Sequence, residues 1–107
     1  MKKTLTFLLT LFAASAFSQP VIEWQRALGG NANDYGYSIQ PTSDGGYITA
    51  GYTSSANNGD VGNNQGNSDC WVVKMDADGD IQWQRTLGGS EADGALSIRQ
   101  TNDGGYI

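Results

Sequence analysis

The sequence predicts an all-β protein built from tandem repeats, and two observations support this prediction. A shift of 59 positions (81 − 22) aligns residues 81–107 with residues 22–48 without a gap, and sixteen of the 27 aligned residues are identical. A fixed period of this size indicates a repeat architecture, in which each unit buries its faces against its neighbours. The 15 glycines all follow residue 18, and aromatic and β-branched residues lie between glycine-rich turns, which favours short strands.

One period contains four expected strands, separated by turns and one long loop. Residues 43–46 and 77–80 contain Asp-Gly pairs, which are typical of tight hairpin turns. Residues 54–69 are rich in Ser, Asn and Gly and form the long loop, and residues 88–93 lead to the next unit. The expected strands comprise residues 37–42, 47–53, 70–76 and 81–87.

Alternation in the last two strands predicts which side chains share a face of the sheet. The third strand places Trp71, Val73 and Met75 together. The fourth strand is expected to place these four side chains together: Ile81, Trp83, Arg85 and Leu87.

Four short strands per repeat, with aromatic residues at fixed positions and glycine-rich turns, favour a β-propeller-like architecture. The chain then holds about one and a half four-stranded antiparallel blades, which is an incomplete ring. We expect a signal peptide at residues 1–18, for reasons given below, followed by a repeat region of residues 19–107. That region comprises the fourth strand of a preceding blade (22–28), a full blade (37–87) and a partial next blade (94–107). Because propellers close with about four to eight blades, we expect the chain to be a fragment of a longer repeat protein.

The repeat motifs also carry a resemblance to a known family. Residues 22–107 contain Trp-Gln-x-x-Leu-Gly-Gly, Asp-x-x-x-Ser-Ile, Asp-Gly-Gly-Tyr-Ile and Trp-Val-Val-Lys-x-Asp in a fixed order. In these motifs the chain resembles the tandem repeats of large exported bacterial β-propeller proteins. The resemblance implies an extracellular or surface protein, often delivered by type IX secretion, and it implies no catalytic residues.

The first 18 residues predict export. Lys2 and Lys3 precede an apolar stretch that is too short to span a bilayer, and small residues at Ala16 and Ser18 fit a cleavage site before Gln19. We therefore expect residues 1–18 to be a signal peptide and the product to be secreted or on the cell surface. Without these residues the charge is 4 − 11 = −7, which disfavours nucleic acid and anionic membrane surfaces as partners.

The side-chain inventory argues against an enzyme. No histidine is present, so the chain has no Ser-His-Asp or Cys-His arrangement, and Cys70 alone cannot form an intrachain disulfide. We assign no catalytic or cofactor-binding residue. Asp76, Asp78 and Asp80 are a weak alternative as calcium ligands, but Gly79 and Leu87 occupy the wrong positions for an EF-hand loop, so a structural turn is favoured.

Two motifs recur at the same repeat positions, which favours a structural role for both. The Asp-box-like sequences at residues 42–46 and 101–105 are interpreted as hairpin turns stabilised by an aspartate. Trp24 and Trp83 occupy equivalent positions, so packing between units is favoured over a sugar-stacking platform. Residues 54–69 offer a variable binding surface, although spacing or disorder is slightly favoured for a loop with no aromatic or basic residue.

These observations predict a non-enzymatic exported repeat segment that acts as a structural scaffold or as an adhesion or binding surface. The alternative is a fragment of a secreted carbohydrate-binding or carbohydrate-active propeller. Expected partners are further repeats of the same protein, and the sequence leaves open whether a surface glycan or another protein also binds.

Overall fold

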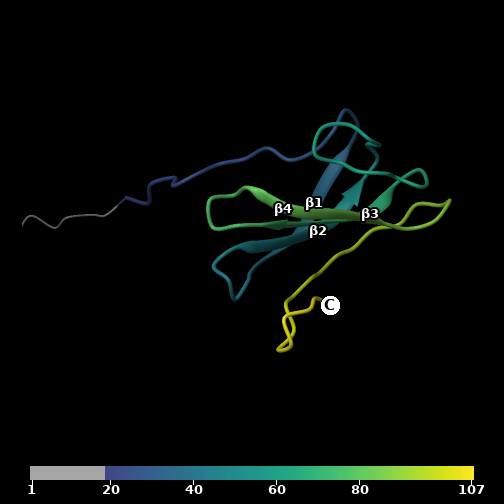
Figure 1. The fold of residues 1–107 in the computed structure, drawn as a ribbon. Coiled ribbons are helices and arrows are strands. Elements are labelled where there is room, and N and C mark those ends of the chain that lie inside the picture. The colour runs from purple at the N-terminus through teal and green to yellow at the C-terminus, as the bar shows by residue number, and fades with distance from the viewer. Residues whose placement is uncertain (1–18) are drawn as a thin grey trace, which may run out of the picture.

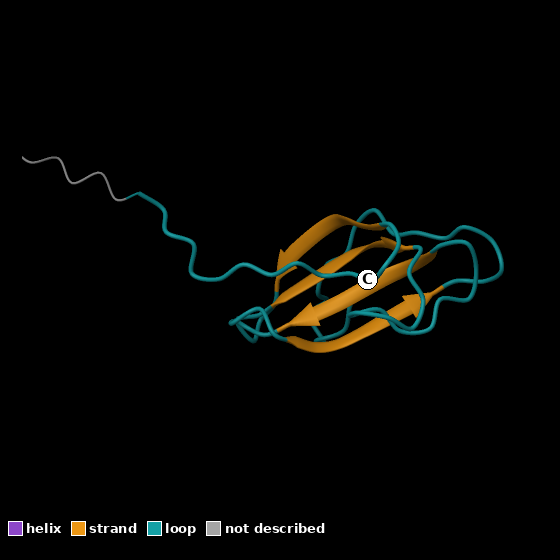
Figure 2. Cartoon of the chain, turned by 90° about the horizontal axis from the view of Figure 1, so that it is seen from above, coloured by secondary structure: helices purple, strands orange, loops and turns teal. Residues whose placement is uncertain are grey.

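The computed structural model describes residues 19–107 and consists of one open β-sheet without a helix. The predicted signal peptide, residues 1–18, lies outside the described residues. Four strands follow one another as an antiparallel meander in the order β1-β2-β3-β4 (Figures 1 and 2). Their bounds are β1 Asp34–Pro41, β2 Tyr47–Thr53, β3 Asp69–Met75 and β4 Ile81–Leu87. The all-β prediction is confirmed. In this part of the chain no helix is long and apolar enough to cross a membrane.

The largest difference in strand bounds concerns β1, which begins three residues before the predicted residue 37. The pairing of β1 with β2 continues past a bulge between Gly36 and Ser38 and reaches Asp34, which lies opposite Thr53. A bulge adds one unpaired residue and lets the strand continue beyond it. The Asp-Tyr-Gly sequence there looks like a loop when it is considered alone, because its strand character depends on the long-range partner.

Both hairpins of the sheet that join strands directly use the same three-residue turn. In the first, the amide of Thr42 donates to the carbonyl of Gly46 at 2.9 Å, and the amide of Gly45 donates back to Thr42 at 3.1 Å. Gly45 and Gly79 each have a φ of 83°, a left-handed conformation that suits glycine. This is a type I turn followed by a glycine bulge, a common hairpin connection. Residues 101–105 repeat it, with the φ of Gly104 at 86°.

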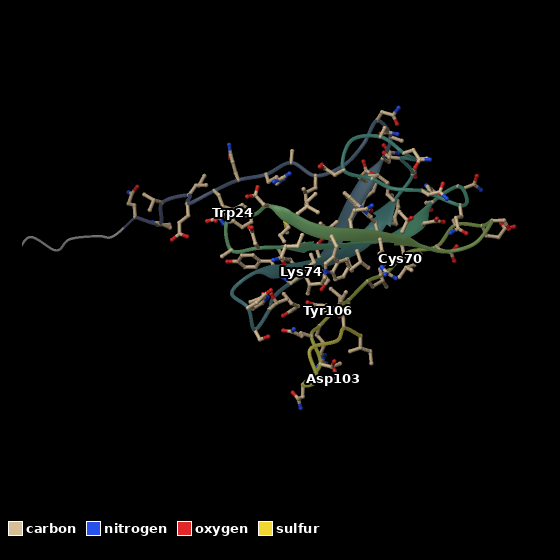
Figure 3. The ribbon with its side chains drawn as sticks, viewed as in Figure 1. Trp24, Cys70, Lys74, Asp103 and Tyr106 are labelled. Atoms are coloured by element: carbon tan, nitrogen blue, oxygen red, sulfur yellow. The ribbon has the colours of Figure 1, made fainter. Side chains whose placement is uncertain are left out.

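The two faces of the sheet are covered by segments from opposite ends of the described chain. Residues 22–28, here called the arm, lie on one face of the sheet, which we call the arm face. Residues 94–107, called the tail, lie on the opposite face, which we call the tail face (Figures 1 and 3). The buried cluster of the arm face comprises Val61, Trp71, Val73 and Met75, with Leu28, Tyr47 and Ile81 packed against it. The cluster of the tail face comprises Ile48, Ala50, Val72 and Ile98, with Cys70, Ala95 and Tyr106 packed against it.

Neither the arm nor the tail forms one of the four strands of this sheet, although strands were predicted in both. The arm has irregular structure throughout. The tail makes a short hairpin, in which Arg99 and Ile107 exchange two backbone hydrogen bonds of 2.9 Å around the turn. Both segments lie across a face of the sheet, where the described chain offers them no strand edge to pair with.

The predicted face of the fourth strand also needs correction. A register shift between Lys74 and Met75 leaves Gln82 without a cross-strand partner, since Lys74 pairs with Trp83 and Met75 pairs with Ile81. The extra residue reverses the alternation. Ile81 therefore packs on the arm face, whereas Trp83 lies on the tail face beside Tyr106.

Candidate functional site

Lys74 on β3 is a deeply enclosed cation, and its side chain is 3% exposed. Its ammonium group donates to Asp44 at 2.9 Å, to the carbonyl of Met75 at 2.9 Å and to Gln82 at 2.8 Å. These contacts use all three donors of a lysine. Lys74 therefore holds the first hairpin turn against β3 and β4, which is a structural role.

Asp44 is arranged to remain ionised. The hydroxyl of Thr42 donates to Oδ1, the ammonium group of Lys74 donates to Oδ2, and the amide of Gly46 donates to Oδ1 at 3.0 Å. In that order, these contacts hold the pKa of Asp44 far below its usual range. The Asp-Gly-Gly-Tyr and Trp-Val-Val-Lys motifs are thus joined by the ion pair between Asp44 and Lys74.

The weak calcium candidate, Asp76, Asp78 and Asp80, does not form a converging set of carboxylates. Oδ1 of Asp76 accepts the amides of Asp78 and Asp80, both at 2.9 Å. The carboxylate of Asp80 instead pairs with Arg26 of the arm at 2.9 Å. Across residues 19–107 no group of three or more acidic, histidine or cysteine side chains is placed to hold a metal ion. The geometry is that of the favoured hairpin turn.

The arm binds the sheet through three side chains at alternate positions. The ring of Trp24 meets the ring of Tyr47 edge-on, with centroids 5.8 Å apart and an interplanar angle of 64°. Arg26 forms the ion pair with Asp80 and also donates to the carbonyl of Gly79 at 3.3 Å. Leu28 packs against the cluster of the arm face. The arm is therefore held by side chains rather than by a strand ladder.

The Trp24 contact recurs one period later. Trp83 meets Tyr106 edge-on, with centroids 5.8 Å apart and an angle of 62°, and each residue lies 59 positions after its equivalent. Figure 3 shows Trp24 and Tyr106 on opposite sides of the sheet. Both tryptophans thus pack against the tyrosine of an Asp-Gly-Gly-Tyr motif. This geometry agrees with the predicted packing role of the two tryptophans.

The Gly-Gly loops are also held in the same way in both copies. The amide of Gly30 donates to Asp34 at 2.8 Å, and the amide of Gly89 donates to Asp93 at 2.9 Å. An ionised carboxylate that accepts a loop amide forms one of the stronger hydrogen bonds in proteins. The aspartate that precedes each Ser-Ile pair is therefore explained by loop geometry.

The long loop, residues 54–69, has defined local structure. The side-chain amide of Asn64 donates to the carbonyls of Thr53 at 3.0 Å and Ser55 at 3.2 Å, and Val61 is buried. Asn side chains that replace backbone partners order a loop in a way that composition does not reveal. At its end Asp69 is fully buried and accepts the amide of Gln65 at 2.6 Å, while Oδ1 has no hydrogen-bond partner in the described chain.

A cluster of three tyrosines on β1 and β2 was missed by the sequence analysis. The rings of Tyr35 and Tyr52 stack with centroids 4.8 Å apart, and those of Tyr37 and Tyr52 lie 5.9 Å apart. Tyr35 and Tyr37 remain 48% and 54% exposed. Burial, followed by the proximity of Tyr37 and Tyr35, raises the pKa of the Tyr52 hydroxyl.

The tyrosine cluster is not required by the repeat. One period later the positions of Tyr35 and Tyr37 are occupied by Gly94 and Leu96. Residues that recur in every unit serve the fold, whereas exposed aromatic residues that do not recur are free to serve binding. The signal was available in the sequence as tyrosines whose repeat equivalents are not aromatic.

Comparison of the chain with models of known protein families, with curated proteins and with solved structures finds no match in any of the three.

Proposed function

We propose that this chain is an exported, non-enzymatic repeat segment of β-propeller type that serves as a structural scaffold or as an adhesion and binding surface. Its sheet is one blade, and each face packs against a unit of the same kind. The observation that carries the proposal is the Trp–Tyr contact, which joins the arm to β2 and recurs with the same geometry between β4 and the tail.

Two further equivalences support packing between repeat units. The hairpin register in which Gln40 pairs with Ile48 recurs in the tail, where Arg99 exchanges hydrogen bonds with Ile107. Ile98 of the tail is 7% exposed on the tail face, whereas its equivalent Ile39 on β1 is 58% exposed. A position that is buried against one unit and open toward the other is what a stack of equivalent units predicts.

Export is tested by expressing the full chain in a bacterial host and determining the mass of the product in each cell fraction by mass spectrometry. We expect a product that begins at Gln19 outside the cytoplasm, because residues 1–18 have the charge and apolar pattern of a signal peptide. A Leu9→Arg variant, which interrupts the apolar stretch, should remain uncleaved inside the cell. Uncleaved parent protein in the cytoplasm would contradict the proposed location.

The tyrosine cluster favours a second candidate function, carbohydrate binding. Tyrosine combines a flat apolar ring with a polar hydroxyl, so adjacent exposed rings suit a sugar that presents C–H groups on one side and hydroxyls at its edge. Tyr35 and Tyr37 provide such a surface, and Tyr52 orients both rings from the neighbouring strand.

Calorimetric titration of the mature chain with a panel of neutral oligosaccharides tests this second function. We expect at least one sugar to bind, and replacement of both Tyr35 and Tyr37 by alanine should reduce its affinity at least tenfold. Leu96→Ala is the matched control, because Leu96 is an exposed residue at the repeat position of Tyr37. Absence of binding across the panel, or equal affinity in the double variant, would rule the function out.

A further inference from the structure

The outer strand β4 presents a row of side chains that repeats the anchors of the arm. Five of the seven residues in the arm, residues 22–28, are identical in β4, and the equivalents of Trp24, Arg26 and Leu28 are Trp83, Arg85 and Leu87. We call these three residues of β4 the β4 stripe. Trp83 is 38% exposed and Leu87 is 51% exposed. The same three anchors therefore occur twice, in the arm, where they contact the arm face, and in the β4 stripe, where Trp83 and Leu87 remain partly exposed.

The arm shows what the β4 stripe lacks. Arg26 pairs with Asp80, and Leu28 packs against the apolar cluster of the arm face. On β4, Trp83 has the equivalent aromatic contact with Tyr106, but Arg85 makes no ion pair within residues 19–107. A cavity of about 300 Å³ remains beside the stripe, lined by its three side chains together with Ile98 and Tyr106 of the tail.

We propose that the β4 stripe is a docking surface for the arm face of a second copy of this chain. The inference rests on the proposed function, because it extends the packing of repeat units from one chain to two. In the docked pair, Arg85 meets Asp80 of the second copy, and Leu87 enters its apolar cluster. Trp83 takes the place that Trp24 occupies within the chain, and Tyr47 of the second copy replaces Tyr106.

Charge complementarity selects a second copy as the occupant. The arm face presents one carboxylate, Asp80, at the position where the arm supplies a guanidinium group 2.9 Å away. The β4 stripe carries a guanidinium group at the equivalent position, and the two sequences are otherwise matched in their aromatic and leucine anchors. The contact is therefore continuous with one that the chain already makes.

The docking is heterologous, because it joins the β4 stripe of one copy to the arm face of the next. A heterologous contact of this kind joins copies head to tail, in a ring or in a linear assembly. The arm and the β4 stripe compete for the same face, and association should therefore be weak and should depend strongly on protein concentration.

Sedimentation analysis of the mature chain over a range of concentrations tests the proposal. We expect reversible association of the parent, and its loss in Arg85→Asp and in Asp80→Arg, because each variant opposes two like charges in the contact. An equimolar mixture of the two variants should associate again, since the carboxylate introduced on one stripe then meets the guanidinium group introduced on the other arm face. In the reverse contact of the same mixture, Arg85 of the Asp80→Arg variant meets Asp80 of the Arg85→Asp variant, which is the pair found in the parent docking. Arg99→Asp is the matched control with the same change in charge and should associate like the parent.

Three results would overturn the docking. These are a monomer at every concentration, an Arg85→Asp variant that associates like the parent, and a mixture that does not recover. Arg85→Asp leaves the arm contact with Asp80 intact, and circular dichroism verifies that each variant is folded.

Trypsin cleavage after Arg26 at the lowest concentration separates failure of the docking from failure of the proposed function. A protected arm in a chain that never associates leaves the packing of units within one chain standing and rejects only the second copy. Rapid cleavage after Arg26 in the folded parent would show that the arm is not packed, and the proposed scaffold would then fail with it.

Discussion

Replacing Gly51 by alanine is expected to destabilise the sheet more than any other single methyl group added to it. A Cβ atom at Gly51 would lie 1.7 Å from the carbonyl oxygen of Tyr35 and 2.9 Å from the Cα of Gly36, and both are backbone atoms that no rotamer change can move. Strand β1 would have to separate from β2. We expect the free energy of unfolding to fall by about 3 kcal/mol and Tm to fall by roughly 10–20 °C, measured by thermal unfolding.

The cross-strand partner supplies the control for this prediction. Gly36 lies directly opposite Gly51, and a Cβ atom added there would have no heavy atom within 4 Å. Gly36→Ala should therefore change the free energy of unfolding by no more than about 0.5 kcal/mol. Equal losses in the two variants would mean that glycine content alone, rather than the approach of β1 to β2, determines the effect.

Replacing Lys74 by methionine is the second large effect that we expect. The substitution keeps most of the apolar volume and removes the three hydrogen bonds that join the first turn, β3 and β4. Urea unfolding should show that the free energy of unfolding falls by about 2–3 kcal/mol. This is below the ~3–5 kcal/mol typical of a broken buried ion pair, because the side chain of Asp44 stays half exposed and can return to water.

The repeat provides an internal control for this ion pair. Asp103 is the equivalent of Asp44, and its pKa is also lowered, by the hydroxyl of Thr101 and then by the amide of Gly105, without a lysine among the causes. Asp44→Asn should therefore lower Tm clearly more than Asp103→Asn. Equal shifts would show that the turn bonds, and not Lys74, determine the contribution of Asp44.

The same carboxylate predicts how stability depends on pH. The pKa of Asp44 is lower in the folded chain than its ordinary value of 3.8, so the unfolded chain binds more protons between those two values. The contribution of Asp44 is complete above the unfolded pKa and is lost as the pH falls through the folded pKa. Unfolding curves should show declining stability below about pH 4, and the decline should be shallower in Asp44→Asn.

Much of the sheet could be predicted from residue patterns, because strands and turns leave local signals. The bounds of β2 and β4 agree with the predicted ranges 47–53 and 81–87, and both Asp-Gly turns lie where their sequences indicate. These features depend on alternation and on glycine at a left-handed position, and both can be read within a few residues.

The remaining features depend on partners that are distant in the sequence. The early start of β1 depends on Thr53, and the reversal of faces in β4 depends on a bulge opposite Lys74. The tyrosine cluster was missed because Tyr52 lies on a different strand from Tyr35 and Tyr37. Long-range pairing and bulges leave little trace in a local pattern, and the strands expected in the arm and the tail were read from that pattern alone.

The position of the arm has a consequence for how such a chain folds. Leu28 of the arm, which precedes the sheet in the sequence, packs against the apolar cluster of the arm face. Under the repeat architecture that we propose, no unit would therefore hold all of its own stabilising contacts. In a linear array of this kind, stability is the sum of each unit and its interface with one neighbour, and it grows with the number of units. Units at the ends should therefore open first, and a change at the Trp24–Tyr47 contact should weaken the unfolding cooperativity of two units at once.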